Sequence, residues 1–272
     1  MTPPSPPAVT LQELAEDPDH HFTRVAAAVR RHFSSRFTLV LSPSNAQSVT
    51  SRVRTTAEDL DDTLAEVRRV VREAGYVGNV WQVGPSSRPH GLARQLAERG
   101  FVPATKPPHE PTLTAMALSR PPAILHSAGV DVRLARDIDE YRQAIGIAME
   151  AFNETPEDAA GWIEAVPSLW AAHDGVHYFT HLAFVDGRPV GFGFSTLVGR
   201  AMLLGGSGVL EAARGRGVYR ALVAARWEHA RSLGHEGLII HAGSMSKPIL
   251  ERCGFETVCT IEVLEDTRLL TE

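Results

Sequence analysis

A short stretch of glycines and arginines has the composition of an anion-binding turn. Residues 209–220 read VLEAARGRGVYR, in which an apolar strand end leads into Arg214-Gly215-Arg216-Gly217 and then into an amphipathic segment. The first amides of a helix lack intrahelical partners and lie at the positive end of the helix dipole, so they favour a phosphate. A glycine lets the phosphate approach because it has no Cβ. The spacing therefore favours the binding of a phosphate or pyrophosphate.

The segments on either side decide whether this turn can hold a ligand. Two glycines beside arginines also end ordinary strands, and RGRG occurs in disordered nucleic-acid-binding segments. Here apolar residues recur at three- and four-residue spacing over 218–233, which predicts a helix that ends at Gly234. The run 237–241 predicts a buried parallel strand, and a short helix over 249–253 ends at Gly254. The turn thus connects a strand to a long helix.

This order of elements, closed by the sequence ERCGFE, resembles the GCN5-related N-acetyltransferases (GNAT), whose pyrophosphate loop reads Q/R-x-x-G-x-G/A. The resemblance covers about residues 130–265. Arg214 and Gly217 match the loop, whereas Tyr219 stands where the family usually has Gly or Ala. The resemblance implies an enzyme that transfers an acyl group from acyl-CoA, with acetyl-CoA as the expected donor, to a primary amine of a small molecule or protein. It implies a cofactor site formed by Val209, Leu210, Arg214, Gly215, Arg216, Gly217, Val218 and Tyr219.

The resemblance also implies that Val209 and Leu210 pair with the pantetheine arm through their backbone, and that an N–H there faces the thioester oxygen. Arg214 or Arg216 would add charge-assisted contacts to the pyrophosphate. Without an anion, two arginines at a helix N-terminus are unfavourable.

Direct attack of an amine on a thioester needs a base for the amine and an acid for the departing thiolate. Many members of the family carry a Tyr acid on the short helix, but Leu250 occupies that position here. Tyr219 is one replacement, with filling the crevice between helix and cofactor as its alternative role, and solvent can also protonate a thiolate. Candidate bases are Glu211, His241 and Glu154. Glu211 can equally be a solvated residue and His241 a hydrogen-bonded core residue.

Composition limits the classes of partner. The net charge of −5 without a basic run makes nucleic-acid binding an unfavoured function. The two cysteines, Cys253 and Cys259, are too few for a disulfide framework and match no metal spacing, and the twelve histidines lack matching partners, so we expect no metal. No segment has the apolar length of a membrane span and no signal peptide is recognisable, so a cytoplasmic protein without a membrane partner is expected. A homodimer is compatible with all of this.

The chain length of 272 residues favours two domains. Residues 1–10 form a Pro-rich tail that is expected to be disordered, and 11–120 form a smaller α/β domain. Ser119-Arg120-Pro121-Pro122 reads as a linker to the acyltransferase domain at 130–272. The fold class expected for the chain is α/β (α+β), in which the second domain has a GNAT-like mixed central sheet with helices on both faces. In the first domain, spacing predicts helices over 11–33, 56–74 and 89–99 and strands over 37–41, 79–83 and 112–118.

A short sequence recurs in the two halves and is called the echo below. LAERGF at 96–101 is similar to LERCGF at 250–255, and each follows an apolar strand and a polar segment ending in Arg-Pro or Lys-Pro. A degenerate duplication, in which the first half is also GNAT-like, and chance recurrence of a common helix-Gly-Phe connection both explain the echo. The first half contains no R-x-x-G-x-G, so it is not expected to bind the cofactor. Capping the acceptor pocket, dimerisation and stabilisation are its candidate roles.

In the second domain, patterning predicts a strand at 131–134, a helix at 137–152, and a hairpin turning at Asp186-Gly187. A polar, Trp-bearing stretch at 153–176 follows the helix, and another strand at 201–210 leads to the glycine turn. The acceptor is expected between 137–176 and the first domain. Candidate wall residues, which could equally be core aromatics, are Phe152, Trp162, Trp170 and Tyr178.

Two functions of other classes also fit this sequence. A noncatalytic module that binds or senses coenzyme A would explain the absent Tyr acid. An acyltransferase of the same fold could take its donor from aminoacyl-tRNA or a carrier protein, although the acidic balance disfavours RNA.

Overall fold

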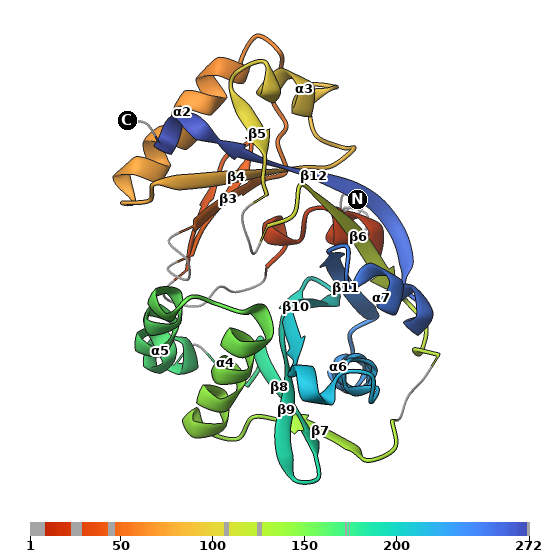
Figure 1. Ribbon diagram of the computed structural model, residues 1–272. Coiled ribbons are helices and arrows are strands. Elements are labelled where there is room, and N and C mark those ends of the chain that lie inside the picture. Colours follow the sequence, from red (N-terminus) through yellow and green to blue (C-terminus); the bar gives the residue numbers. More distant parts are fainter. Residues whose placement is uncertain are drawn as a thin grey trace, which may run out of the picture.

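The computed structural model of the chain describes residues 9–22, 29–42, 47–105, 109–123, 127–171, 173 and 175–270 (Figure 1). The strands are β1 (Arg30–Phe33), β2 (Thr38–Ser42), β3 (Gln47–Ser51), β4 (Gly78–Val83), β5 (Phe101–Pro103), β6 (Thr112–Leu118), β7 (Val130–Leu134), β8 (Tyr178–Val185), β9 (Arg188–Val198), β10 (Ala201–Val209), β11 (Gly237–Ala242) and β12 (Glu256–Asp266). The α-helices are α1 (Leu11–Glu16), α2 (Leu60–Glu73), α3 (Leu92–Ala97), α4 (Ile138–Phe152), α5 (Pro156–Ala171), α6 (Val218–Ser232) and α7 (Lys247–Cys253). None of the helices in these ranges has the length and apolar character needed to cross a membrane.

The described strands form one mixed sheet. Its order is β1-β2-β3-β4-β12-β6-β11-β10-β9-β8-β7, with β5 paired to β12. Only β3–β4 and β10–β11 are parallel among these pairs. The expected mixed α/β fold is confirmed.

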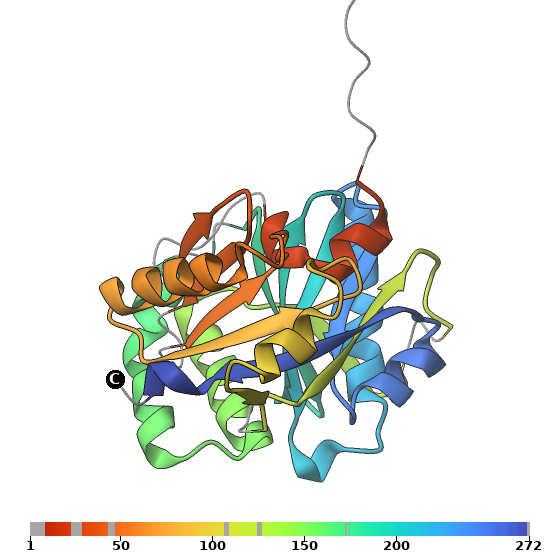
Figure 2. The same ribbon diagram turned by 90° about the horizontal axis from the view of Figure 1, so that it is seen from above.

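Helices cover the sheet in separate groups. In the N-terminal half, α2 and α3 belong to one apolar cluster with the strands that they cover, as can be followed in the view from above (Figure 2). In the C-terminal half, α6 and α7 pack on one face and α4 on the other, with α5 against α4. The short helix α1 packs between the halves, because its residues Leu11 and Leu14 share one cluster with Val80 of β4 and Val198 of β9.

Two strands cross between the halves (Figure 1). β6 precedes the expected linker, yet it lies between β11 and β12, pairing Leu238 with Leu118 and Glu256 with Ala117. The far end of β12 extends into the N-terminal half, where it pairs with β4 and β5. Each half of the sheet therefore contains a strand from the other, and the sequence boundary at 120–130 does not separate two independent sheets.

The two halves repeat one succession of elements. β3–α2–β4–α3 in the first half corresponds to β10–α6–β11–α7 in the second, and each contains one parallel pair. The echoing sequences lie at equivalent places. LAERGF leads from α3 through Gly100, at φ +91°, to β5, and LERCGF leads from α7 through Gly254, at φ +98°, to β12. This correspondence supports the duplication over the chance explanation.

Local structure departs from expectation in the first half and after α4. The helix expected over 11–33 is present only at its start, because α1 ends before Pro18 and residues 30–33 form the edge strand β1; residues 23–28 lie outside the described ranges. β3 was not expected. The stretch 153–176 contains the helix α5, whose apolar residues pack on α4. The tail expected at 1–10 lies mostly outside the described residues.

A buried ion pair fastens the crossing strand β12. Arg68 of α2 donates from Nε to Oδ2 of Asp266 at 2.6 Å and from Nη2 to Oδ1 at 3.0 Å, and the Asp266 side chain is 1% exposed. We expect Asp266→Ala to lower the free energy of unfolding by about 3 kcal/mol, because Arg68 then stays largely buried without a carboxylate. Urea denaturation measures this loss.

The matched control is Asp61→Ala. Asp61 also pairs with an arginine, Arg99, but its side chain is 75% exposed, so its removal should leave the urea midpoint unchanged. Equal losses in the two variants would contradict the assigned role of the buried pair.

Candidate functional site

β10 and β11 separate in the middle of the C-terminal half. They pair from Ala201↔Gly237 to Leu203↔Ile239, and beyond this point no further pairing between them occurs in the described residues. β10 has a bulge between Leu204 and Ser207 in its pairing with β9 and runs on to Val209, while β11 runs on to Ala242. The facing edges of both strands are thus open to an extended ligand.

The glycine turn follows the open end of β10. After a 3-10 turn at Glu211–Ala213, α6 begins at Val218 and its first backbone bond runs from the Ala221 N–H to the Gly217 carbonyl, at 3.0 Å. The amides of residues 218–220 precede that bond and have no partner within the helix. Gly215 has φ +78°, and a Cβ placed there would meet nothing within 4 Å. The space beside Gly215 is therefore open, and anion binding at this turn stays a prediction.

Val209 and Leu210 differ in the direction of their amides. The Leu210 N–H donates to the Val190 carbonyl at 2.9 Å, so it faces β9. Backbone groups alternate along a strand, so the Val209 N–H and C=O point to the opposite, open edge. The Val209 carbonyl there accepts a hydrogen bond from Arg214 Nε at 3.3 Å. Of the two residues, only Val209 has its amide directed at the opening.

Gly217 is constrained by the protein itself. Ser127 Oγ donates to the Gly217 carbonyl at 3.0 Å, and a Cβ on Gly217 would lie 2.7 Å from that Oγ. Arg216, in contrast, is exposed and lies 3.6 Å from Asp186 in the hairpin turn. A substitution of Gly217 would therefore disturb packing as well as any ligand, and nothing in the sequence pointed to Ser127.

Tyr219, the candidate acid, is the second residue of α6. It packs against the apolar cluster that contains Leu250 and Cys253. Burial raises the pKa of the Tyr219 phenol, and the nearby Arg226 only partly offsets this. The hydroxyl thus stays protonated at neutral pH, as an acid requires.

His241 lies on β11 beyond its last pair with β10. Its Nε2 is 2.8 Å from the Ala15 carbonyl of α1, and because a carbonyl only accepts, Nε2 carries the hydrogen and Nδ1 keeps a lone pair. Burial lowers the pKa of His241, although the carbonyls of Ala15 and Glu16 oppose this. The ring is therefore neutral at pH 7, the state that a base needs.

The other two candidate bases lie elsewhere. Glu211 is exposed in the 3-10 turn at the far end of β10. The bulge lies about five residues earlier, or about 15 Å along a strand. Glu154 is half-buried just after α4, beyond Asn153 at φ +55°. The structure thus gives His241, rather than Glu211, a place beside the opening between the strands.

The four aromatic residues expected at a pocket lie in three separate places. Trp162 and Trp170 of α5 pack against α4 in the core that includes Tyr141. Phe152 is 49% exposed and lies at the bulge, where a Cβ on Gly206 would be 4.0 Å from its ring. Tyr178 is half-buried at the start of β8.

A buried arginine stabilises the bulge of β10. Nothing in the sequence pointed to this residue. Arg226 of α6 is 0% exposed, and its Nη1 donates to Ser207 Oγ at 2.8 Å and to the Phe194 carbonyl at 3.4 Å. Burial lowers the pKa of Arg226 to about 10, which leaves it charged at pH 7. A Cβ on Gly193 would lie 2.9 Å from its Cζ, so the guanidinium fits because residue 193 is glycine.

We expect Gly193→Ala to lower the free energy of unfolding by about 2 kcal/mol, because the added methyl group collides with Arg226. In an Arg226→Met background the same substitution should cost much less, since the collision is removed. A double-mutant cycle by urea denaturation measures this coupling. The same cost in both backgrounds would show that the collision is not the cause.

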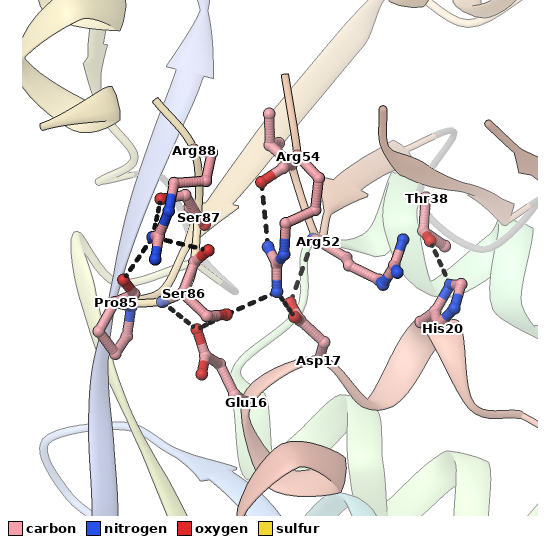
Figure 3. A network of polar contacts seen from close by, with 11 residues as sticks. Glu16, Asp17, His20, Thr38, Arg52, Arg54, Pro85, Ser86, Ser87 and Arg88 are labelled. Carbon is pink, nitrogen blue, oxygen red and sulfur yellow. Dashed lines mark hydrogen bonds and ion pairs between the residues drawn. The ribbon is translucent and has the colours of Figure 1, made fainter. Parts of the chain in front are cut away.

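The equivalent place in the N-terminal half is closed. Beyond β3 and β4, the Arg88 N–H donates to the Val53 carbonyl at 2.9 Å and the Thr55 N–H to the Arg88 carbonyl at 3.4 Å. Side chains close it further, because Arg54 bonds both Ser86 and Asp17 (Figure 3). Within its described residues, this half thus lacks the open strand edges of the C-terminal half. In the described ranges, no group of three or more His, Cys, Asp or Glu side chains could hold a metal ion.

The comparisons with known proteins agree with this geometry. The model of the acetyltransferase (GNAT) family matches residues 140–255. No curated protein matches the chain. A GCN5-related N-acetyltransferase from Kribbella flavida shares its fold at a TM-score of 0.70 and 17% identity, over 94% of this chain and 95% of that one. One from Sphaerobacter thermophilus gives a TM-score of 0.60 at 17% identity, over 86% and 81% of the two chains.

A tandem GNAT protein from the clavulanic acid biosynthesis pathway covers both halves. It aligns with a TM-score of 0.60 at 16% identity, over 94% of this chain and 93% of its own. At such identities the likeness concerns the fold, and it agrees with the repeated succession of elements. Residues 140–255 are therefore a domain of the acetyltransferase (GNAT) family, and the chain around them has the fold of a tandem GNAT protein.

Proposed function

We propose that the protein transfers an acyl group from acyl-CoA, with acetyl-CoA as the expected donor, to a primary amine of a small molecule or protein. One observation carries this proposal: a parallel strand pair opens after Leu203↔Ile239, and the strand that leaves it ends in a glycine turn at a helix N-terminus. An extended thioester arm and its pyrophosphate need this combination of an open strand edge and free amides.

The residues then divide the work of binding. The amides of residues 218–220 bind the pyrophosphate, with Gly215 leaving the approach open and Arg214 and Arg216 adding charge. The Val209 N–H bonds the pantetheine arm on the open edge of β10. A backbone amide near the bulge would stabilise the oxyanion, an effect of about 3 kcal/mol on the barrier.

Two side chains carry the protons. His241 accepts a proton from the amine at Nδ1 as the amine nitrogen attacks the thioester carbon. The C–S bond then breaks, and Tyr219 donates its proton to the departing thiolate. Both groups have the protonation state at pH 7 that these roles require.

The test is calorimetric titration of acetyl-CoA and free coenzyme A into the wild-type protein, followed by an assay of thiol release with a panel of amines. Binding with amine-dependent thiol release would support the proposal. Binding without turnover would favour the noncatalytic coenzyme A module, which Leu250 in place of a Tyr also favours. Absence of binding would exclude acyl-CoA as the donor and leave an aminoacyl-tRNA or carrier-protein donor to test.

A further inference from the structure

Three arginines and two histidines gather where the N-terminal half meets β8 and β9. Arg31 of β1 donates from Nη1 to the Phe22 carbonyl at 2.9 Å, and Phe22 forms a β-bridge to Val198. Burial, followed by Arg52, His21, Arg54 and Arg31, lowers the pKa of His20 to about 4. These cations are therefore close enough to act on one ring.

Carboxylates lie beside two of these arginines. Asp17 Oδ2 is 2.9 Å from Arg54 Nη2, and the Asp19 carboxylate interacts electrostatically with Arg31. The Arg52 side chain makes no hydrogen bond or ion pair within the described part of the chain. It extends away from Asp17 toward His20 (Figure 3). Among the described residues, Arg52 is therefore the arginine of this cluster whose guanidinium is available to a ligand.

The backbone conformation of Arg52 is strained. Arg52 follows β3 with φ +49°, a left-handed conformation that strains a residue with a Cβ by about 1 kcal/mol or more. Its N–H donates to Asp17 Oδ1 at 3.1 Å, which fixes this corner. Glycine would adopt the conformation more easily, so folding alone does not explain an arginine here.

The cluster lies near the proposed point of acyl transfer. Arg31 interacts electrostatically with Tyr178 of β8. Tyr178 pairs with Thr196, and Thr196 with Leu203, which belongs to the last pair before the strands separate. Tyr178 is therefore two strands from the opening, or about 10 Å. A small molecule can span the distance from Tyr178 to the opening.

We propose that the acceptor is an amine that also carries an anionic group, a carboxylate or a phosphate, which Arg52 binds with Arg31 beside it. Binding of the anionic group at the N-terminal half would direct the amine toward the opening between β10 and β11. This inference rests on the proposed acyltransferase function. It gives the N-terminal half a role in substrate recognition.

Two pairs of amines test the proposal: L-phenylalanine with 2-phenylethylamine, and O-phosphoethanolamine with ethanolamine. The members of each pair differ only in a carboxylate or a phosphate group. Calorimetric titration, with and without coenzyme A, compares their affinities for the full-length protein. We expect the anionic member of at least one pair to bind about tenfold tighter or more, as expected for one charge-assisted contact. The pair that shows the difference identifies the anion.

The decisive variant is Arg52→Gly, which removes the guanidinium while easing the backbone at φ +49°, so misfolding is not a concern. It should abolish the preference, and Arg52→Lys should keep part of it. Arg69→Gln makes the same change in net charge on the exposed face of α2 and should keep all of it. A preference that survives Arg52→Gly, or no preference in the wild type, would overturn the proposal.

The coenzyme A titration separates this proposal from the function on which it rests. A protein that binds coenzyme A without the amine preference loses only the assignment of the acceptor. One that shows the Arg52-dependent preference without binding coenzyme A keeps the anion site and loses the proposed donor.

Discussion

Gly215→Asp is expected to lower the affinity for coenzyme A by about 100-fold, because its carboxylate would stand beside the pyrophosphate and like charges at such distances cost several kcal/mol. Gly215 suits this test better than Gly217. A Cβ at Gly215 meets nothing within 4 Å, whereas one at Gly217 would collide with Ser127. Calorimetric titration of acetyl-CoA measures the change.

Gly215→Asn is the matched control. Asn and Asp have nearly the same size and both tolerate the left-handed backbone at φ +78°. Both variants therefore carry the same strain and bulk, and only the Asp variant adds charge. We expect Asn to keep affinity within about tenfold of the wild type. Equal losses in both variants would mean that bulk or strain is responsible, and would remove the support for an anion at this turn.

His241→Asn is expected to lower kcat/KM by about 100-fold without changing the affinity for coenzyme A, since a positioned base typically contributes 100-fold or more. Asn is too short to place a donor where Nε2 lies, so the bond to the Ala15 carbonyl is lost, and the unchanged affinity for coenzyme A serves as the check that the variant is folded. The measurement is the initial rate of thiol release against amine concentration. Glu211→Gln is the control, because Glu211 is exposed beyond the open strand edge, and it should retain nearly full activity.

The pH dependence of the same assay tests the role of His241 independently. Burial lowers the pKa of His241 below 6.5, so the ring loses its proton before neutral pH is reached. Protonation of His241 should therefore lower the kcat/KM of the wild type only below pH 6.5, because the charged ring can no longer accept a proton. His241→Asn should lack this part of the profile. A similar decline in the variant would assign it to another group.

Local patterns in the sequence predicted much of the C-terminal half. The spacing of apolar residues predicted α6, and the structure places its start at Val218, directly after the glycine turn. The Asp186-Gly187 turn predicted the β8–β9 hairpin, and both residues have the positive φ that it requires, at 51° and 75°. These features depend on neighbours in the sequence, so the residue types alone carry the signal.

The candidate site was only partly visible in the sequence. The turn and His241 could be identified, because a glycine-arginine run and a histidine at a strand end can be recognised from the residue types alone. The orientation of the His241 side chain could not be predicted, because it depends on a hydrogen bond to Ala15, which is 226 positions earlier in the chain. Arg226 looked like one more residue of an amphipathic helix. Its role depends on Gly193 and Ser207, which only the strand register brings beneath it.

By itself, the sequence determined the glycine turn, the helix that follows it and the resemblance to the GNAT family. The tertiary structure decided that β6 and β12 cross between the halves, that β10 and β11 open while β3 and β4 are closed beyond their ends, and that Arg31 lies near Tyr178 of β8. Turns and helices are set by contacts within a few residues. Strand exchange and the clustering of charges depend on pairing between segments far apart in the chain, which a single sequence does not record.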